Sequence, residues 1–428
     1  MSQNQDPLRR SRLAWYFYDW ANSAFGTIII TFVFSVYVTK SVIGEADDGS
    51  GYWSLTVALS GFLVAITAPF IGSLADSGDG NAKWLRITTV ACAILTCFLI
   101  FLPPSAPLWM IIAGLGIVAL AHAASELSYV FYNAMLPALA GEKNIGRISG
   151  TAWGVGFLGG IASLVLILLL CIGVGGVGPF LPLSEEGGWN VRASVIFVAL
   201  WYFIFALPLM MYPPRQDVST PSAGTNFQEL KKTVKVILKM PDLLRLLIAS
   251  ALYRDGLATL FAVGGTFAAA AFDMDYTEIL IFAIGLNISS GIGAIVLARI
   301  DDVIGSKATI VLSLVGLIVS GATILALEDK WLFIAAALVM GLFIGPAQAS
   351  SRTFVARLAP AEKRAQIFGF YALSGKAVAF LGPLAYGYLT LWSGSARVGL
   401  LSVLAFWFFG LVILLTVKRG GKHEPENP

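Results

Sequence analysis

Six charged side chains lie inside long apolar stretches of the sequence. Three are acids and three are bases: Asp19, Glu126, Asp255, Arg254, Arg352 and Lys376. A charge inside a membrane-spanning helix costs at least a few kcal/mol, so such residues usually bind a substrate, carry an ion or pair with one another. A balanced set suits a zwitterion, because bases can bind a carboxylate and acids can bind an ammonium group.

The stretch around Asp19 has an echo later in the chain. Residues 17–25 align without a gap with residues 253–261, so that Asp19 matches Asp255 and Ser23 matches Thr259. The two stretches open the first apolar segment of each half of the chain. This repetition is expected of a transporter built from two repeats around a central site.

Two sets of candidate site residues follow from these patterns. For substrate binding we expect a carboxylate to meet the bases and an amine to meet the acids, in a set comprising Asp19, Asn22, Arg254, Asp255, Gln348, Arg352 and Lys376. For proton coupling we expect Asp19 or the pair His122 and Glu126, which are spaced i to i+4 and so share one helix face. A purely structural pair that holds its helix to a neighbour explains His122 and Glu126 equally well.

The composition is that of a polytopic α-helical membrane protein. Of 428 residues, 57% are hydrophobic and 12% are charged, and soluble domains carry roughly twice that charged fraction. Apolar runs of roughly 20 residues can each cross a bilayer. They predict twelve spans, at about 14–42, 52–74, 84–103, 108–139, 148–174, 191–212, 242–271, 277–298, 308–327, 331–358, 366–391 and 397–417. The fourth and tenth are longer than a bilayer needs, which predicts tilt or projection beyond it.

Lysine and arginine concentrate in alternate loops, on the side that carries the N-terminus, whereas the opposite loops carry mainly acids. This asymmetry predicts that both termini are cytoplasmic. The basic start of the chain lacks the apolar core of a signal peptide, so we expect the first span to direct insertion into a plasma (inner) membrane.

The longest interruption between apolar segments runs from Pro213 to Pro241. Its second part alternates apolar residues with lysines at helical spacing, which predicts a basic amphipathic helix on the membrane surface. We therefore expect an N-terminal half at 1–212, a linker at 213–241 and a C-terminal half at 242–428.

Two short glycine-bearing loops repeat the same pattern of an acid followed by a base. Asp76 precedes Lys83 after the second span, and Asp302 precedes Lys307 after the eighth. An acid at a helix end can meet the N-terminus of a neighbouring helix, and the base can pair with it. An ordinary capped turn is the plainer interpretation, but the matching positions in both halves favour a shared role.

These loops resemble the conserved loop motif of the major facilitator superfamily, which implies a gating role for the four residues. The resemblance also implies an all-α fold of twelve transmembrane helices in two pseudo-symmetric halves, with the first, fourth, seventh and tenth spans lining a central cavity. Residues 18–24, 131–137, 345–348 and 368–371 are similar to the vacuolar effluxer-like branch, the family of autophagy-related amino-acid effluxers and their bacterial relatives. That similarity implies alternating access, export of amino acids, and a monomer.

The sequence leaves three alternatives open. A proton-coupled carrier of sugars or lipophilic compounds would use the charges only for gating. A membrane receptor or lipid-handling protein would move no solute. An intramembrane enzyme is disfavoured, because the charges form no nucleophile–base pair or metal cluster by spacing. We expect no cofactor, no metal and no nucleic-acid partner. No nucleotide-binding motif is present, so gradients, including one of protons, must supply the drive.

Overall fold

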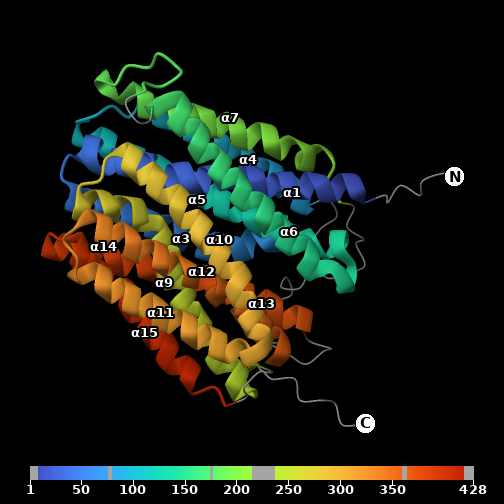
Figure 1. Ribbon diagram of the computed structural model, residues 1–428. Helices are drawn as coiled ribbons and strands as arrows, with labels where there is room; N and C mark the ends of the chain where they lie inside the picture. Colours follow the sequence, from blue (N-terminus) through green and yellow to red (C-terminus); the bar gives the residue numbers. More distant parts are fainter. Residues whose placement is uncertain (1–7, 76–79, 174–176, 215–236, 359–363, 419–428) are drawn as a thin grey trace, which may run out of the picture.

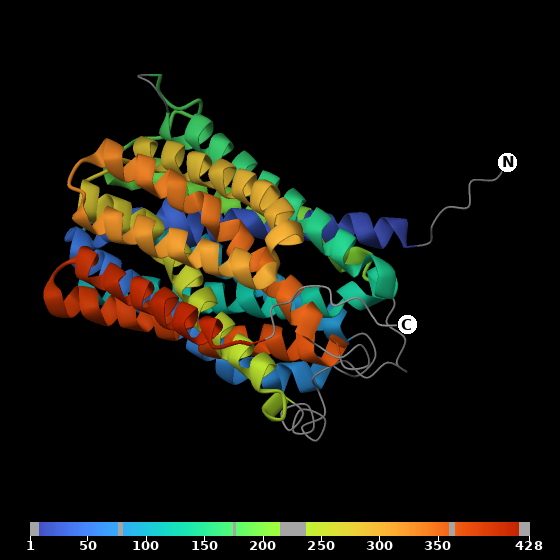
Figure 2. The ribbon, with the colours of Figure 1, turned by 60° about the horizontal axis from the view of Figure 1, so that its bottom comes forward.

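A computed structural model describes residues 8–75, 80–173, 177–214, 237–358 and 364–418. The chain is nearly all helical, and its long helices run roughly side by side (Figures 1 and 2). The elements in chain order are α1 (Arg9–Ala24), η1 (Phe25–Phe32), α2 (Phe34–Tyr37), η2 (Val38–Ile43), α3 (Ala46–Ala75), α4 (Gly80–Phe98), η3 (Leu99–Phe101), α5 (Leu108–Ala134), α6 (Leu136–Ile167), η4 (Leu168–Ile172), η5 (Glu186–Gly188), α7 (Trp189–Met211), α9 (Pro241–Phe272), α10 (Tyr276–Ile304), α11 (Ser306–Ala326), α12 (Lys330–Leu358), α13 (Arg364–Val378), α14 (Leu381–Ser393) and α15 (Ala396–Leu415).

Within the described residues, 11 helical segments are long and apolar enough to cross a membrane. The eleventh predicted span, 366–391, is present but is broken into α13 and α14, so neither piece reaches that length. The break precedes Gly382 and Pro383. Proline lacks an N–H and disfavours helical geometry in the residue before it, but it is tolerated in the first turn of a new helix. One span is therefore made of two shorter helices.

The predicted boundary between the fourth and fifth spans is wrong. The sequence places a loop near 140–147, whereas α5 ends at Ala134 and α6 begins at Leu136 and continues for 32 residues. Pro137 lies in the first turn of α6, where the missing N–H has no cost, and so favours a helix start at this point. The expected projection after the fourth span thus belongs to the following helix.

The helices form two groups, α1–α7 and α9–α15. In the first group α1 packs against α6 and α7, and in the second α9 packs against α15. The groups meet chiefly where α3 packs against α14 and α9. Most of the predicted amphipathic helix of the linker lies outside the described residues.

An aromatic cluster holds α1 in place. Trp15 stacks on Tyr132 of α5 with ring centroids 4.3 Å apart, and its indole N–H donates to the Tyr132 carbonyl at 3.0 Å. Tyr18 is fully buried, and its hydroxyl lies 2.7 Å from that of Thr89 and 3.0 Å from that of Tyr202. These contacts fix the helix turn that carries Asp19.

The first span contains wide π-helical turns, η1 and η2. Thr31 Oγ1 donates to the carbonyl of Gly26, five residues earlier, at 2.9 Å. Turns of this kind are rare and are often found at functional sites. Here η1 lies between Asp19 and Lys40, and η2 contains Lys40.

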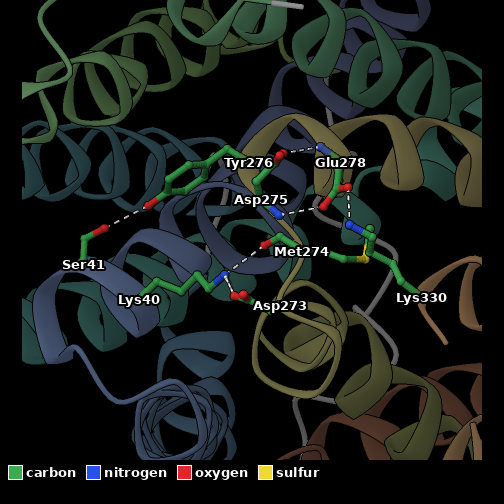
Figure 3. Close-up of polar contacts among 8 residues, drawn as sticks. All are labelled: Lys40, Ser41, Asp273, Met274, Asp275, Tyr276, Glu278 and Lys330. Carbon is green, nitrogen blue, oxygen red and sulfur yellow. Dashed lines mark hydrogen bonds and ion pairs between the residues drawn. The ribbon is translucent and has the colours of Figure 1, made fainter. Parts of the chain in front are cut away.

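The two groups are joined at the end of the bundle where Lys40 lies, which we call the Lys40 end (Figure 3). Lys40 Nζ pairs with Asp273 Oδ1 at 2.6 Å and donates to the Met274 carbonyl at 3.1 Å. The hydroxyls of Ser41 and Tyr276 lie 3.1 Å apart. The opposite end, where α1 begins, is called the Arg9 end. The start of α9 also lies there, beside the end of α15, because Asp242 Oδ1 accepts from Lys418 N at 3.1 Å.

Candidate functional site

Asp19 is buried, with 3% of its surface exposed. Its carboxylate accepts a hydrogen bond from the hydroxyl of Tyr129 on α5. One turn later, Asn22 is also buried, and its Oδ1 accepts from Ser125 Oγ at 2.9 Å. Both predicted substrate-binding residues of the first span are therefore engaged by α5.

Asp255 is the counterpart of Asp19 in the second group, and the repeat extends to its contacts. Ser23 Oγ donates to the Asp19 carbonyl at 2.8 Å, and Thr259 Oγ1 donates to the Asp255 carbonyl at 2.8 Å. Their carboxylates differ in partner, because Asp255 Oδ2 accepts from the backbone N–H of Gly382 at 2.8 Å. Asp255 therefore caps the start of α14 at the break between α13 and α14.

Arg254 turns away from Asp255 and lies against α13. Its guanidinium sits 4.4 Å from the ring centroid of Tyr371 and donates a long hydrogen bond of 3.4 Å to the Tyr371 carbonyl. A Cβ at Gly375 would lie 3.0 Å from Arg254 Nη1, so the absence of a side chain there makes room for the guanidinium. The described residues offer Arg254 no carboxylate within ion-pair distance.

Glu126 and Lys376 form an ion pair between α5 and α13, and thus between the two groups. The side chains remain 33% and 37% exposed, respectively, so the pair is only partly buried. Lys376 lies two residues before the end of α13. The sequence predicts a charged set, but spacing within one chain segment could not show that these two residues meet.

His122 bonds to α3 rather than to Glu126. Its Nδ1 lies 2.7 Å from Ser60 Oγ, and that hydroxyl donates to the Val57 carbonyl at 2.7 Å. Since the Ser60 proton is used in this way, the arrangement favours a proton on Nδ1 and a bare Nε2. The helix face that His122 and Glu126 share thus contacts two different partners.

The two predicted site residues on α12 are partly buried. Arg352 lies near enough to Asp19, Tyr129 and Arg254 to interact with them electrostatically. The structure therefore brings most of the predicted charged residues into one region: Asp19 and Glu126 from the first group, and Arg254, Arg352 and Lys376 from the second. Gln348 lies one helical turn from Arg352.

The four predicted gating residues are described unequally. Asp76 and the side chain of Asp302 lie outside the described residues, and Lys83 is exposed on α4. Lys307 Nζ donates to the carbonyls of Leu415 and Val417 at 3.2 and 2.6 Å, within its own group. Next to Asp302, the described contacts belong to Asp301, which accepts from Ser306 Oγ at 2.8 Å and lies 3.4 Å from Arg357.

Sequence reasoning did not single out the contacts at the Lys40 end. Lys40 and Asp273 both stand at helix ends and look like ordinary loop charges. Asp273 is largely exposed, and the pKa of its carboxyl is lowered because Lys40 donates a hydrogen bond to it and adds a nearby positive charge. Their equivalent positions could have indicated the contact, because Lys40 and Asp273 each stand at the end of the first span of their half.

Comparison with known proteins assigns the chain to a family. A family profile described as "Vacuole effluxer Atg22 like" matches residues 38–424. The chain belongs to this family. It is 25% identical over 419 residues to an uncharacterized MFS-type transporter, YxiO, of Bacillus subtilis (strain 168), with 94% of each chain covered.

More distant relatives include Autophagy-related protein 22-1 of Aspergillus fumigatus, 23% identical over 305 residues. That match covers 64% of this chain and 48% of the relative, so the matched part spans about half of the fungal protein.

The fold is that of the major facilitator superfamily. A D-xylose–proton symporter superposes with a TM-score of 0.71 at 10% identity, covering 97% of this chain and 98% of the symporter. The nucleoside transporter NupG superposes with a TM-score of 0.63 at 17% identity, covering 96% and 98%. At these identities the likeness shows the fold. Together with the family match, it confirms the predicted fold class and identifies a membrane transporter of the major facilitator type.

Proposed function

We propose that this Atg22-like transporter exports an α-amino acid or a similar small zwitterion across the plasma membrane. In this proposal residues 1–212 and 242–428 are the halves that move, residues 213–241 link them, and both termini are cytoplasmic. The Arg9 end then faces the cytoplasm, the Lys40 end faces outward, and a single chain carries out transport.

One observation carries the proposal. Arg254 lies midway along a membrane-spanning helix, partly buried, and no carboxylate among the described residues pairs with it. An arginine within a membrane is costly unless it has a use. A guanidinium binds a carboxylate with two parallel hydrogen bonds, and this one lies against Tyr371 in the room that Gly375 leaves. Arg254 is therefore the best anchor for a substrate carboxylate.

The Glu126–Lys376 pair suits the remaining part of a zwitterion. Because both side chains are about one-third exposed, a solute that carries both charges can compete for each of them. We assign the substrate ammonium group to Glu126, because Asp19 and Asp255 are buried and engaged by protein groups. Lys376 and Arg352 assist Arg254, and Asn22 and Gln348 complete the polar lining.

We propose that protons drive transport, with Glu126, His122 and Asp19 as coupling groups. The bare Nε2 of His122 can accept a proton. Protonation of Glu126 would remove the negative charge that attracts Lys376. Asp76, Lys83, Asp302 and Lys307 are proposed to control the Arg9 end.

Counterflow in proteoliposomes tests the substrate class. Vesicles preloaded with single amino acids should accumulate labelled amino acid from outside. With Arg254→Gln, uptake at a subsaturating concentration should fall at least tenfold, whereas Arg397→Gln, at the Lys40 end of the second group, is the matched control. Amidated amino acids, which lack the carboxylate, should not compete. Competition by an uncharged sugar would favour the sugar carrier, and absence of flux with any solute would favour a receptor.

A further inference from the structure

Asp255 has a carboxylate oxygen that plays no part in the proposed substrate binding. Its side chain lies within the membrane-spanning part of α9, and only 2% of the residue is exposed. Oδ2 accepts from Gly382 N–H at 2.8 Å, but the buried Oδ1 has no hydrogen-bond partner. A buried polar atom without a partner is uncommon in native structures and calls for a physical reason.

No neighbouring charge compensates this carboxylate within the described residues. On its own helix, Arg254 faces Tyr371. On α13, Lys376 pairs with Glu126, and on α12, Arg352 interacts with Asp19. Other polar groups on the packed helices bond elsewhere: Ser50 with Tyr386, Ser54 with the Pro383 carbonyl, Tyr253 with Ser351, and Arg397 with carbonyls at the Lys40 end. On α15 the buried indole Nε1 of Trp407 has no hydrogen-bond partner, so it does not compensate Asp255 either.

Two opposing effects act on the carboxyl group. Burial without a counter-ion makes the ionised form costly. The N-terminus of α14 stabilises that same form through the Gly382 N–H that donates to Asp255. A proton on Oδ1 would remove the cost of burial and would weaken the bond to Gly382, because a charge-assisted hydrogen bond is stronger than a neutral one.

We propose that Asp255 is a proton-binding site, and that binding of its proton controls the conformation of the break between α13 and α14, which we call the joint. The site goes beyond the proposed coupling groups and rests only on the chain being a transporter. Gly382 fits Asp255 closely, since a Cβ there would lie 2.1 Å from Thr259 Oγ1 and 3.1 Å from Asp255 Oδ1. The joint lies four residues beyond Lys376, so a change at Asp255 reaches the Glu126–Lys376 pair along α13.

Infrared difference spectroscopy of the full-length protein in lipid vesicles tests the site without any substrate. Stepwise acidification should reveal the carbonyl stretch of a protonated carboxylic acid. One component of that band should be lost in Asp255→Asn, whose amide oxygen can still accept from Gly382, and retained in the matched variant Asp19→Asn. A titrating difference spectrum that Asp255→Asn leaves unchanged, or no such band in the unsubstituted protein, would overturn the proposal.

Hydrogen exchange of the segment 379–386 tests the joint. At a pH where the unsubstituted protein lacks the band, Asp255→Asn should exchange this segment at least tenfold faster, and acidification past the midpoint should remove the difference. Equal exchange at every pH refutes the link to the joint. If Asp255→Asn does not fold, Asp255→Glu serves instead. It should shift the infrared midpoint, because the longer side chain moves the carboxylate relative to Gly382, and an unchanged midpoint contradicts the site.

Discussion

Glu126 and Lys376 join the two halves of the transporter by an ion pair that is only partly buried. In the proposed transport cycle the halves separate on one side at a time, and about one third of each of these side chains is exposed. The pair is a structural contact, and under the proposed function it is also the contact that a charged solute replaces.

Removing the charge of one member of the Glu126–Lys376 pair should lower the stability of the protein more than removing both charges. In Glu126→Gln, Lys376 loses its partner in a low-dielectric region, and the melting temperature should fall. The loss should stay below the roughly 3–5 kcal/mol seen when a fully buried pair is broken, because this pair is partly exposed. Thermal unfolding in detergent, followed by tryptophan fluorescence, measures the effect.

The charge exchange Glu126→Lys with Lys376→Glu is the informative control. It should restore most of the thermal stability, because the two charges still attract. Counterflow should remain at least tenfold below that of the unsubstituted protein, since Arg254 still fixes the carboxylate and the ammonium group then meets a lysine. Full recovery of both stability and transport would reduce the pair to a structural contact.

Gly382→Ala should destabilise the protein, because the added Cβ would lie 2.1 Å from Thr259 Oγ1. Overpacking of this kind typically costs about 1–3 kcal/mol. Thr259→Ala in the same chain should recover part of the loss by removing the hydroxyl. Gly264→Ala on α9 is the control, since nothing lies within 4 Å of its Cβ position. Melting temperatures of the four proteins decide the outcome.

Tyr129→Phe should leave the carboxylate of Asp19 without the hydroxyl that donates to it. Removing a donor from a buried acceptor costs about 1–3 kcal/mol. Tyr52→Phe, at an exposed position of α3, should change the melting temperature little. Equal shifts in the two variants would indicate that the Tyr129 hydroxyl does not stabilise Asp19.

Acid should weaken closure of the Lys40 end. Asp273 has a lowered pKa in the bridged form, whereas an unpaired aspartate titrates near 3.9. The bridge to Lys40 thus contributes fully above about pH 4 and is lost as the pH falls through the lowered value. Because Asp273 is exposed, the effect should be small and should weaken in high salt.

The reporter for this prediction is a cysteine at Val42, which is 2% exposed, in a chain whose native cysteines are replaced. Labelling by a membrane-impermeant maleimide should be a few-fold faster in Asp273→Asn than with Asp273 present, when both are measured at neutral pH. A labelling rate that Asp273→Asn leaves unchanged would show that the bridge does not hold this end closed.

Much of the fold was predictable, because length and apolarity alone specify a membrane helix. The repeat of Asp19 at Asp255 was also visible, and the structure extends it to the bonds made by Ser23 and Thr259. What the sequence could not show is pairing between helices. His122 and Glu126 share a face, yet they contact α3 and α13. The direction of a side chain is set by its own helix, but its partner is set by the packing of others.

The helix breaks were harder to foresee. Pro383 indicates a break in an otherwise continuous apolar run, but α7 and α12 each contain a proline and remain continuous helices. Local sequence therefore did not decide between a kink and a new helix. In this structure the buried carboxylate of Asp255 supplies the cap that a new helix start requires.

The wide turns of η1 bear on how the first span works. A π turn holds more residues than an α turn, so tightening it to α geometry would rotate everything beyond it by about 100° for each residue absorbed. Asp19 lies before this segment and Lys40 after it. A change of winding in η1 would therefore rotate the end of the first span that carries Lys40 relative to Asp19, and would alter the pairing of Lys40 with Asp273.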